Sequence, residues 1–418
     1  MSDAYSKLLD RRKQALGPTY THFYEKPLHI VRGEGIWLYD SDGRAYLDCY
    51  NNVPSVGHCN PQVVDSICEQ TRTLNTHTRY LHENIVSYSE MLTATMPEDD
   101  YVALFVCTGT EANDLAYRIA SSVTGRRGVI ITENVYHGNS TLVAELSPGE
   151  GRSHPCPDFI EEISAPDTYR GSVDSDSVDD AVARLRRNGH DVAALYIEGA
   201  FENPGLFCPD AAYFKSIAAK TRAAGGLIVF DEVQSGLCRQ GENIWSYQNS
   251  GLVPDIITMG KSLGCGYPLA AVVVRRSVIE AFGKTTDYFN TFGGNPVATA
   301  AGIAVLNYIH ENDILKSVHQ TGRYFRAGLE KLKDQHDLIG DIRGKGLFIG
   351  VDLVRDRQTK AHASLEAKRL IELLKEEGML VSTVGVHGNI LKMRPPLIFN
   401  RQNADMALDM MATSLAAL

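Results

Sequence analysis

Two short apolar runs that each end in a charged residue constrain the fold of this 418-residue chain more than any other feature. Residues 227–230 lead directly into Asp231, and residues 256–259 lead through one glycine into Lys261. A short apolar run bounded by turn residues is typical of a strand buried on both faces of a sheet. Because ligands of open α/β sheets bind at the carboxyl ends of the strands, Asp231 and Lys261 are expected to face one ligand site.

The combination of a buried carboxylate with a buried lysine indicates the kind of ligand. A lysine amine can condense with an aldehyde and afterwards carry protons. A carboxylate can keep a pyridinium nitrogen protonated. Pyridoxal 5'-phosphate (PLP) carries both partner groups. Taken singly, Lys261 could be a surface lysine and Asp231 a helix N-cap after a strand, but their arrival at neighbouring strand ends favours the cofactor.

Strands alternate with helices through the middle of the chain, which predicts an α/β fold with a parallel or mixed sheet. Besides the two runs above, strands are expected at 102–107, 129–131, 193–198 and 269–274. Helices are expected at 57–74, 85–95, 114–123, 177–187, 211–224 and 297–304. From about residue 311 the pattern changes to α+β, with strands at 346–353, 379–382 and 390–393 and a helix at 365–377.

This pattern predicts three segments. Residues 1–56 form an N-terminal arm and a small-domain hairpin, residues 57–310 a large domain, and residues 311–418 a C-terminal small domain. The hairpin joins an alternating run at 30–40 to a partner strand at 44–49 through the turn Asp40–Gly43. Residues 147–168 are rich in Pro, Gly and Ser and are expected to form a long surface excursion.

Composition narrows the function and the compartment. The formal net charge of −10 argues against nucleic-acid binding, because there is no basic excess to neutralise phosphates. The eight cysteines are scattered, so neither a zinc site nor a disulfide framework is expected. The polar N-terminus does not resemble a signal peptide, and no apolar stretch has the roughly 18 residues of a membrane span. We expect a cytoplasmic enzyme without a membrane partner.

Four other stretches carry groups that suit a cofactor or substrate, and each has an ordinary alternative. Thr108–Thr110 lies between a strand and a helix, where backbone N–H groups can hold a phosphate or form a capping box. Tyr136 could stack on a flat ring, and Thr291 could add a hydroxyl to a phosphate. Arg394 could bind a carboxylate or a phosphate, or form a surface ion pair.

Taken together, these segments resemble the class III (ω-type) aminotransferases of PLP fold type I. The resemblance extends from about Gly33 to Pro396 and lies in an ordered series of motifs. These are Gly57–Cys59, Thr108–Asn113, Tyr136–Gly138, Asp231–Gln234, Lys261 and Thr291–Pro296. It implies an α/β large domain with a mostly parallel seven-stranded sheet flanked by helices, and a small α+β domain built from both termini.

The resemblance also implies a role for each matching residue. Lys261 looks like the Schiff-base lysine, and Asp231 looks like the partner of the pyridine nitrogen. Gln234 looks like a neighbour of the phenolic oxygen, and Tyr136 looks like the aromatic residue that stacks on the ring. Gly109 and Thr110 look like the phosphate cradle, which Thr291 of the other subunit completes. Because this family builds its sites between subunits, a homodimer is implied, possibly paired into a tetramer.

A narrower resemblance lies in residues 46–53 and 74–86, which look like the branch of ethanolamine-phosphate phospho-lyase and alanine–glyoxylate aminotransferase 2. Two positions depart from the family pattern: Asn60, where these relatives often carry His, and Glu198–Ala200, where many class III enzymes have Glu-Pro. Neither departure removes a catalytic group, but both leave the choice of substrate open.

Two reactions fit these residues, and they share every step up to a carbanion that the Asp231-supported ring stabilises. A phospho-lyase expels phosphate from Cβ, so that O-phosphoethanolamine gives acetaldehyde, ammonia and phosphate. A transaminase instead returns the proton to the cofactor and releases a carbonyl product. Arg79, His77 and His82 are candidate ligands of a leaving phosphate, and Arg394 suits a carboxylate or a phosphate. We favour the phospho-lyase on resemblance; a PLP-binding protein without catalysis is the least favoured alternative.

Overall fold

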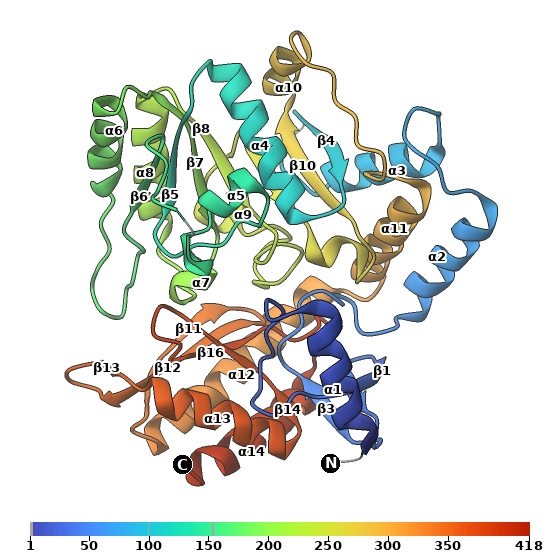
Figure 1. The fold of residues 1–418 in the computed structure, drawn as a ribbon, viewed down its shortest axis with the longest axis vertical. Helices are drawn as coiled ribbons and strands as arrows, with labels where there is room; N and C mark the ends of the chain where they lie inside the picture. Colours follow the sequence, from blue (N-terminus) through green and yellow to red (C-terminus); the bar gives the residue numbers. More distant parts are fainter. Residues whose placement is uncertain (1–2, 99, 153) are drawn as a thin grey trace.

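A seven-stranded sheet forms the centre of the computed structural model, which describes residues 3–98, 100–152 and 154–418 (Figure 1). In spatial order its strands are β4 (Tyr101–Val106), β10 (Ala270–Arg275), β9 (Ile256–Met259), β8 (Leu227–Asp231), β7 (Val192–Glu198), β5 (Gly128–Thr132) and β6 (Ile160–Ile163). Only β10 runs antiparallel to its neighbours in this sheet. The predicted α/β fold with a mostly parallel seven-stranded sheet is confirmed.

The two faces of this sheet pack into separate apolar clusters, as the period of two along a strand requires. On β8, Val229 belongs to one cluster, whereas Ile228 and Phe230 belong to the other. The first cluster contains α4 (Gly109–Thr124) and α10 (Arg276–Gly283). The second contains α2 (Pro61–Thr73), α3 (Glu83–Thr93), α6 (Ser177–Arg187), α8 (Ala211–Ala223) and α11 (Pro296–Glu311). Shorter helices are α5 (Thr141–Glu145), α7 (Glu202–Gly205) and α9 (Tyr247–Ser250).

Both ends of the chain meet in a second body, which lies below the large sheet and next to α7 in the view of Figure 1. One of its sheets has the strand order β1 (Ile30–Glu34), β2 (Trp37–Asp40), β3 (Ala45–Asp48) and β14 (Met379–Leu380). The small sheet has the order β11 (Ile339–Lys345), β12 (Phe348–Asp356), β16 (Ile390–Met393) and β15 (Ser382–Val384), and β13 (Ala361–His362) pairs with β12. The helices are α1 (Asp3–Leu16), α12 (Ile314–Gln335), α13 (Ser364–Glu377) and α14 (Arg401–Ala416). Pairing of β3 with β14 joins the two termini, while the exact boundaries at 57 and 311 stay predictions.

Several elements differ from those expected, and four of the differences have a local physical cause. The run at 30–40 is two strands, because Gly35 takes a left-handed conformation with φ of +58°. Helix α4 begins at Gly109 rather than at 114, since Thr108 and Glu111 form a capping box. The excursion at 147–168 contains β6, whose edge position leaves half of its residues only partly buried. Strand β11 was missed, because its two glycines and three charged residues hide the apolar pattern.

Asp352 of β12 connects the large and small parts of the chain. This carboxylate is fully buried and accepts hydrogen bonds from Arg170 (2.7 and 3.2 Å), from Arg343 (2.5 Å) and from Asn389 (2.6 Å). Arg170 follows β6 of the large sheet, whereas the other three residues belong to the small sheet. The pairing therefore fixes the small part against the large one.

We expect Asp352→Ala to lower the free energy of unfolding by about 3–5 kcal/mol, because it removes the fully buried carboxylate that Arg170 and Arg343 share. Thermal and urea unfolding of the purified variant measure this loss. Asp356→Ala on the same strand is the control, since its carboxylate is exposed and bonds only to the adjacent turn at Thr359. Equal stability of the two variants would contradict a connecting role for Asp352.

No helix in the part of the chain that the structure describes is both long and apolar enough to cross a lipid bilayer.

Candidate active site

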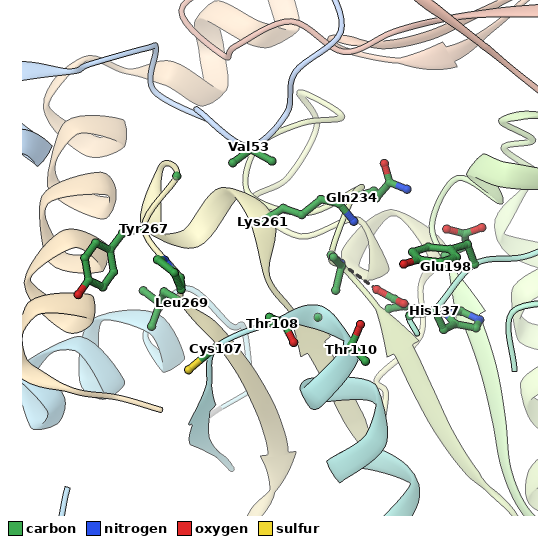
Figure 2. A pocket seen from close by; sticks show the side chains of 17 residues that line it. Val53, Cys107, Thr108, Thr110, His137, Glu198, Gln234, Lys261, Tyr267 and Leu269 are labelled. Atoms are coloured by element: carbon green, nitrogen blue, oxygen red, sulfur yellow. Dashed lines mark hydrogen bonds and ion pairs between the residues drawn. The ribbon is translucent and has the colours of Figure 1, made fainter. Parts of the chain in front are cut away.

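A cavity of about 330 Å³ lies at the carboxyl ends of β4, β5, β7, β8 and β9; we call it the main pocket. Six residues singled out from the sequence line it: Gly109, Thr110, Tyr136, Asp231, Gln234 and Lys261. Figure 2 shows side chains from these separate strand ends arranged around one space. The structure therefore brings these candidates together where an α/β sheet presents its ligands.

Asp231 is a buried carboxylate whose orientation is fixed on both oxygens. Its Oδ2 accepts hydrogen bonds from Nδ1 of His137 at 2.7 Å and from Nδ2 of Asn113 at 2.9 Å. Its Oδ1 accepts from the backbone N–H of Val233 at 2.9 Å. These donors hold the carboxyl group in one orientation, and the residue is 5% exposed. The site therefore offers a fixed negative charge, which suits a protonated ring nitrogen.

Lys261 follows β9 and begins a short 3-10 turn. Its φ of +39° is unusual for a residue with a side chain, and such conformations are concentrated at functional sites. Burial lowers the pKa of its ammonium to about 8, and the nearby charge of Arg394 adds to that effect. A lysine with this pKa supplies a substantial fraction of neutral amine near neutral pH, as a nucleophile and proton carrier require.

The lowered pKa of Lys261 predicts how the cofactor-free protein takes up PLP. We expect the uptake rate to rise as the pH increases through about 8, because only the neutral amine attacks an aldehyde. Visible absorbance after addition of PLP, recorded over a pH series, measures that rate. Arg394→Met should move the midpoint upward, since it removes a positive charge that disfavours the ammonium. A wild-type midpoint near the ordinary lysine value of 10.5 would contradict this account.

The first turn of α4 forms one wall of the main pocket. In the capping box, the N–H of Glu111 donates to Oγ1 of Thr108. The N–H groups of the two helical residues before Glu111 have no acceptor within the helix. Gly138 passes close to this turn, and a Cβ on Gly138 would lie 2.5 Å from Oγ1 of Thr110. The arrangement is a cradle that suits a phosphate group, and it coexists with the capping box that the sequence also allowed.

Three further groups complete the wall. Tyr136 is half-buried there, and burial raises the pKa of its phenol. Burial, with the charges of Glu202 and Asp231, raises the pKa of Glu198 well above its usual range. Gln234 donates its amide to Glu202, and its Oε1 is buried with no hydrogen-bond partner within the described residues. That orphaned oxygen indicates a partner supplied by a ligand.

The sequence reasoning missed a buried ion pair beside the main pocket. Lys392 pairs with Glu202, and Nη1 of Arg394 lies 4.0 Å from the same carboxylate. Burial alone would raise the pKa of Glu202, but the charges of Lys392 and Arg394 overcome this and lower it to about 2. The sequence carries one signal for Lys392. It lies two residues before Arg394 at the end of the same predicted strand, and residues two apart on a strand point to the same face.

Arg394 is buried but not saturated with acceptors. Its Nε donates to the backbone oxygen of Tyr50 at 3.0 Å, while Nη1 is buried without a hydrogen-bond partner among the described residues. An unpaired buried guanidinium N–H is costly. Arg394 therefore has donors available for an anionic substrate group.

The remaining candidates lie away from the main pocket of their own chain. The guanidinium of Arg79 lies 4.0 Å from the ring centroid of Phe289, and His77 stacks on Tyr80. His82 caps α3 by accepting from the N–H of Asn84. Thr291 is in an exposed turn before α11. None of these four lines the main pocket, so the predicted roles of Arg79, His77 and His82 as substrate ligands, and of Thr291 in a partner's site, stay predictions.

The fold and the pocket define a PLP-dependent enzyme of fold type I. The family model of class III aminotransferases matches residues 19–415, and the chain belongs to that family. A solved phospholyase from Arthrobacter, in complex with phosphoethanolamine, is 41% identical and has a TM-score of 0.94, with 98% of this chain and 100% of that chain covered.

The curated relatives include proteins named as phospho-lyases and proteins named as aminotransferases. Ethanolamine-phosphate phospho-lyase homolog 1 of Caenorhabditis elegans is 37% identical over 423 residues, which is 95% of this chain and 90% of that protein. The alanine–glyoxylate aminotransferase 2-like protein of Drosophila melanogaster is 37% identical over 414 residues, which is 94% of this chain and 84% of that protein. The relatives therefore support a lyase or a transaminase.

Proposed function

We propose that this protein is a PLP-dependent phospho-lyase that acts on a phosphorylated primary amine, best represented by O-phosphoethanolamine. The products are an aldehyde, ammonia and phosphate. The observation that carries the proposal is the buried guanidinium of Arg394, which has an unpartnered N–H and lies in the same cluster as Lys261 and Lys392. A guanidinium beside the catalytic lysine suits a substrate whose far end is a dianion.

The relatives add support from outside the chain. The Arthrobacter phospholyase was solved with phosphoethanolamine, and its similarity to this chain covers nearly all of both proteins. We therefore assign that substrate class here. The compound joins an amine, which would take the place of the Lys261 amine on the cofactor aldehyde, to a phosphate, which Arg394 would receive.

The chain's own residues divide the chemistry between them. Bound PLP would supply the aldehyde and an electron-accepting ring. Asp231 would hold the ring nitrogen's proton, Tyr136 would stack on the ring, and the first turn of α4 at Gly109 and Thr110 would bind the cofactor phosphate. Lys261 would remove a proton from the substrate carbon next to the amine, and its pKa near 8 suits that transfer near neutral pH. Expulsion of phosphate from the next carbon would then leave an enamine, which water hydrolyses to the aldehyde and ammonia.

A class III aminotransferase that uses pyruvate or glyoxylate is the second candidate. The name of the Drosophila relative favours it, and Arg394 suits a substrate carboxylate as well as a phosphate. The two reactions make the same use of Lys261 and Asp231 up to the carbanion, so these two residues do not distinguish between them.

We also propose that two copies associate through an exposed apolar surface formed by residues 77–82 and 289–292. Leu81 is fully exposed and Phe292 is 69% exposed. The two segments contact each other where Arg79 and His77 meet Phe289. Such a surface is unusual on a monomer. The association would let Thr291 and Arg79 reach the partner's main pocket.

The dimer is tested by Leu81→Asp, which should shift the molar mass measured by light scattering from two chains to one. PLP retention should fall with it, because Thr291 would no longer reach the partner's site. Val386→Asp, at another exposed apolar side chain, is the control and should leave the mass unchanged. A wild-type mass of one chain would contradict the proposal.

A substrate comparison tests the role of Arg394. We expect Arg394→Met to reduce kcat/KM for O-phosphoethanolamine at least ~10-fold more than for a plain amine assayed with pyruvate, because one charge-assisted contact is lost. Arg401→Met, at an exposed arginine that packs on Tyr324, is the control. Equal losses on both substrates would show that Arg394 does not contact the phosphate.

A further inference from the structure

A second cavity, of about 510 Å³, lies between the N-terminal segment and the small sheet. Polar atoms make up most of its wall. Its polar lining includes His22, Tyr50, Glu150, Asn203, Ser382 and Lys392. None of these residues lines the main pocket, so the cavity needs an account of its own.

Two contacts place this second cavity next to the main pocket. Buried Glu202 accepts a hydrogen bond from Gln234, which lines the main pocket, and pairs with Lys392, which lines the second cavity. Glu150 lies close enough to Tyr136 to raise the pKa of that phenol, as a lesser cause than burial. The side chain of Glu202 therefore lies between the main pocket and the second cavity.

Lys392 brings its amino group to the wall of the second cavity. The residue is 7% exposed, and its ammonium carries three donors, of which Glu202 occupies one. Ser382 lies directly opposite Lys392 in the antiparallel pairing of β15 with β16, and opposite residues of such a pair present their side chains on one face. An ammonium and a hydroxyl therefore lie side by side at this end of the cavity.

The charges around Lys392 favour an anion. Lys392 and Arg394 carry two positive charges against the one negative charge of Glu202. On the rim, His22 accepts a hydrogen bond from Arg12 at 3.0 Å, which places a guanidinium behind the imidazole. Glu150 is a carboxylate of the wall, and its charge directs an anion toward the Lys392 end.

We infer that the second cavity is an oxyanion site for phosphate, with Lys392 and Ser382 as its donors and Glu202 as the internal counter-ion that holds Lys392 while the site is empty. The inference rests on the proposed function only for the origin of the phosphate, which is either the group released by the reaction or the phosphate ester of an arriving substrate. Binding weakens the Lys392–Glu202 pair, so Glu202 opposes the anion.

Isothermal titration of PLP-loaded protein with inorganic phosphate tests the site, because the cofactor already occupies the cradle on α4. Lys392→Met should weaken binding by at least ~10-fold, the size of one lost charge-assisted contact. Lys375→Met is the matched control, since Lys375 is another buried lysine paired with a glutamate but does not line the cavity. Unchanged binding in Lys392→Met, or equal weakening in both variants, would overturn the inference.

Glu202→Gln is the second variant, and it decides the matter if Lys392→Met does not fold. It keeps Lys392 in place and removes the competing charge, so phosphate should bind about 5-fold more tightly or better. Glu372→Gln, which alters the control pair, should leave the affinity unchanged. Equal or weaker phosphate binding in Glu202→Gln would contradict the assigned role.

Ethyl phosphate distinguishes the two sources, because it is a phosphate ester without an amine. Binding of both ligands that depends on Lys392 supports entry of the substrate through the cavity. Binding of inorganic phosphate alone supports a site for the released product. If Lys392-dependent binding is present but O-phosphoethanolamine is not cleaved, the proposed function fails and the oxyanion site stands. If O-phosphoethanolamine is cleaved without Lys392-dependent binding, the oxyanion site fails and the proposed function stands.

Discussion

Replacing Lys261 with alanine is expected to reduce kcat/KM by about 10⁴-fold or more. The change removes the nucleophile that holds the cofactor aldehyde and the base that moves the substrate proton. The visible absorbance of the lysine-bound cofactor should disappear as well. The fold should persist, because Lys261 forms no ion pair within the described residues and its loss opens space only toward the main pocket.

Lys331→Ala is the control, since this lysine lies on the exposed side of α12. It should retain both turnover and absorbance. Persistent turnover of Lys261→Ala, with PLP absorbance unchanged, would show that another lysine serves the reaction. Loss of the folded state in Lys261→Ala would instead show that the residue is structural.

Asp231→Asn is expected to reduce kcat by about 10²–10³-fold, the typical cost of losing one preorganised electrostatic contact. The amide carries no charge to keep a ring nitrogen protonated. Its NH2 group would also face at least one of the donors of His137, Asn113 and Val233 that now meet the carboxylate. The absorbance spectrum of the loaded variant should shift, and its affinity for PLP should fall.

The adjacent residue provides a matched control. Glu232 is a buried carboxyl group that accepts from Ser235, Ser246 and the N–H of Tyr247, and burial raises its pKa to about 7. It does not line the main pocket. Glu232→Gln should therefore leave the cofactor spectrum unchanged, even if stability falls. Identical spectral shifts in both variants would contradict a specific role for Asp231.

Much of the main pocket could be predicted from local pattern. Asp231 and Lys261 follow apolar runs, and the position of a strand end is set by where such a run stops. The rule that ligands bind at strand ends then places the two side chains in one cavity. The same reasoning found Gly109, Thr110 and Tyr136, because each of them also follows a predicted strand.

The rest of the site depends on contacts that no local pattern encodes. Lys392 and Glu202 are 190 residues apart in sequence, and only the packing of the small sheet against α7 brings them together. Gly109 was expected before the helix rather than inside it, because the capping box that starts α4 was considered only as an alternative. In the proposed dimer Thr291 and Arg79 would act in a partner's site, which the pattern of one chain cannot place.

Release of free phosphate from O-phosphoethanolamine by the PLP-loaded protein, with no 2-oxo acid present, tests the central claim most directly. The account predicts continuous release, with acetaldehyde and ammonia formed in equal amounts and with no release by Lys261→Ala. No phosphate from the loaded wild-type enzyme, alongside steady conversion of alanine and glyoxylate, would contradict the lyase and establish the aminotransferase.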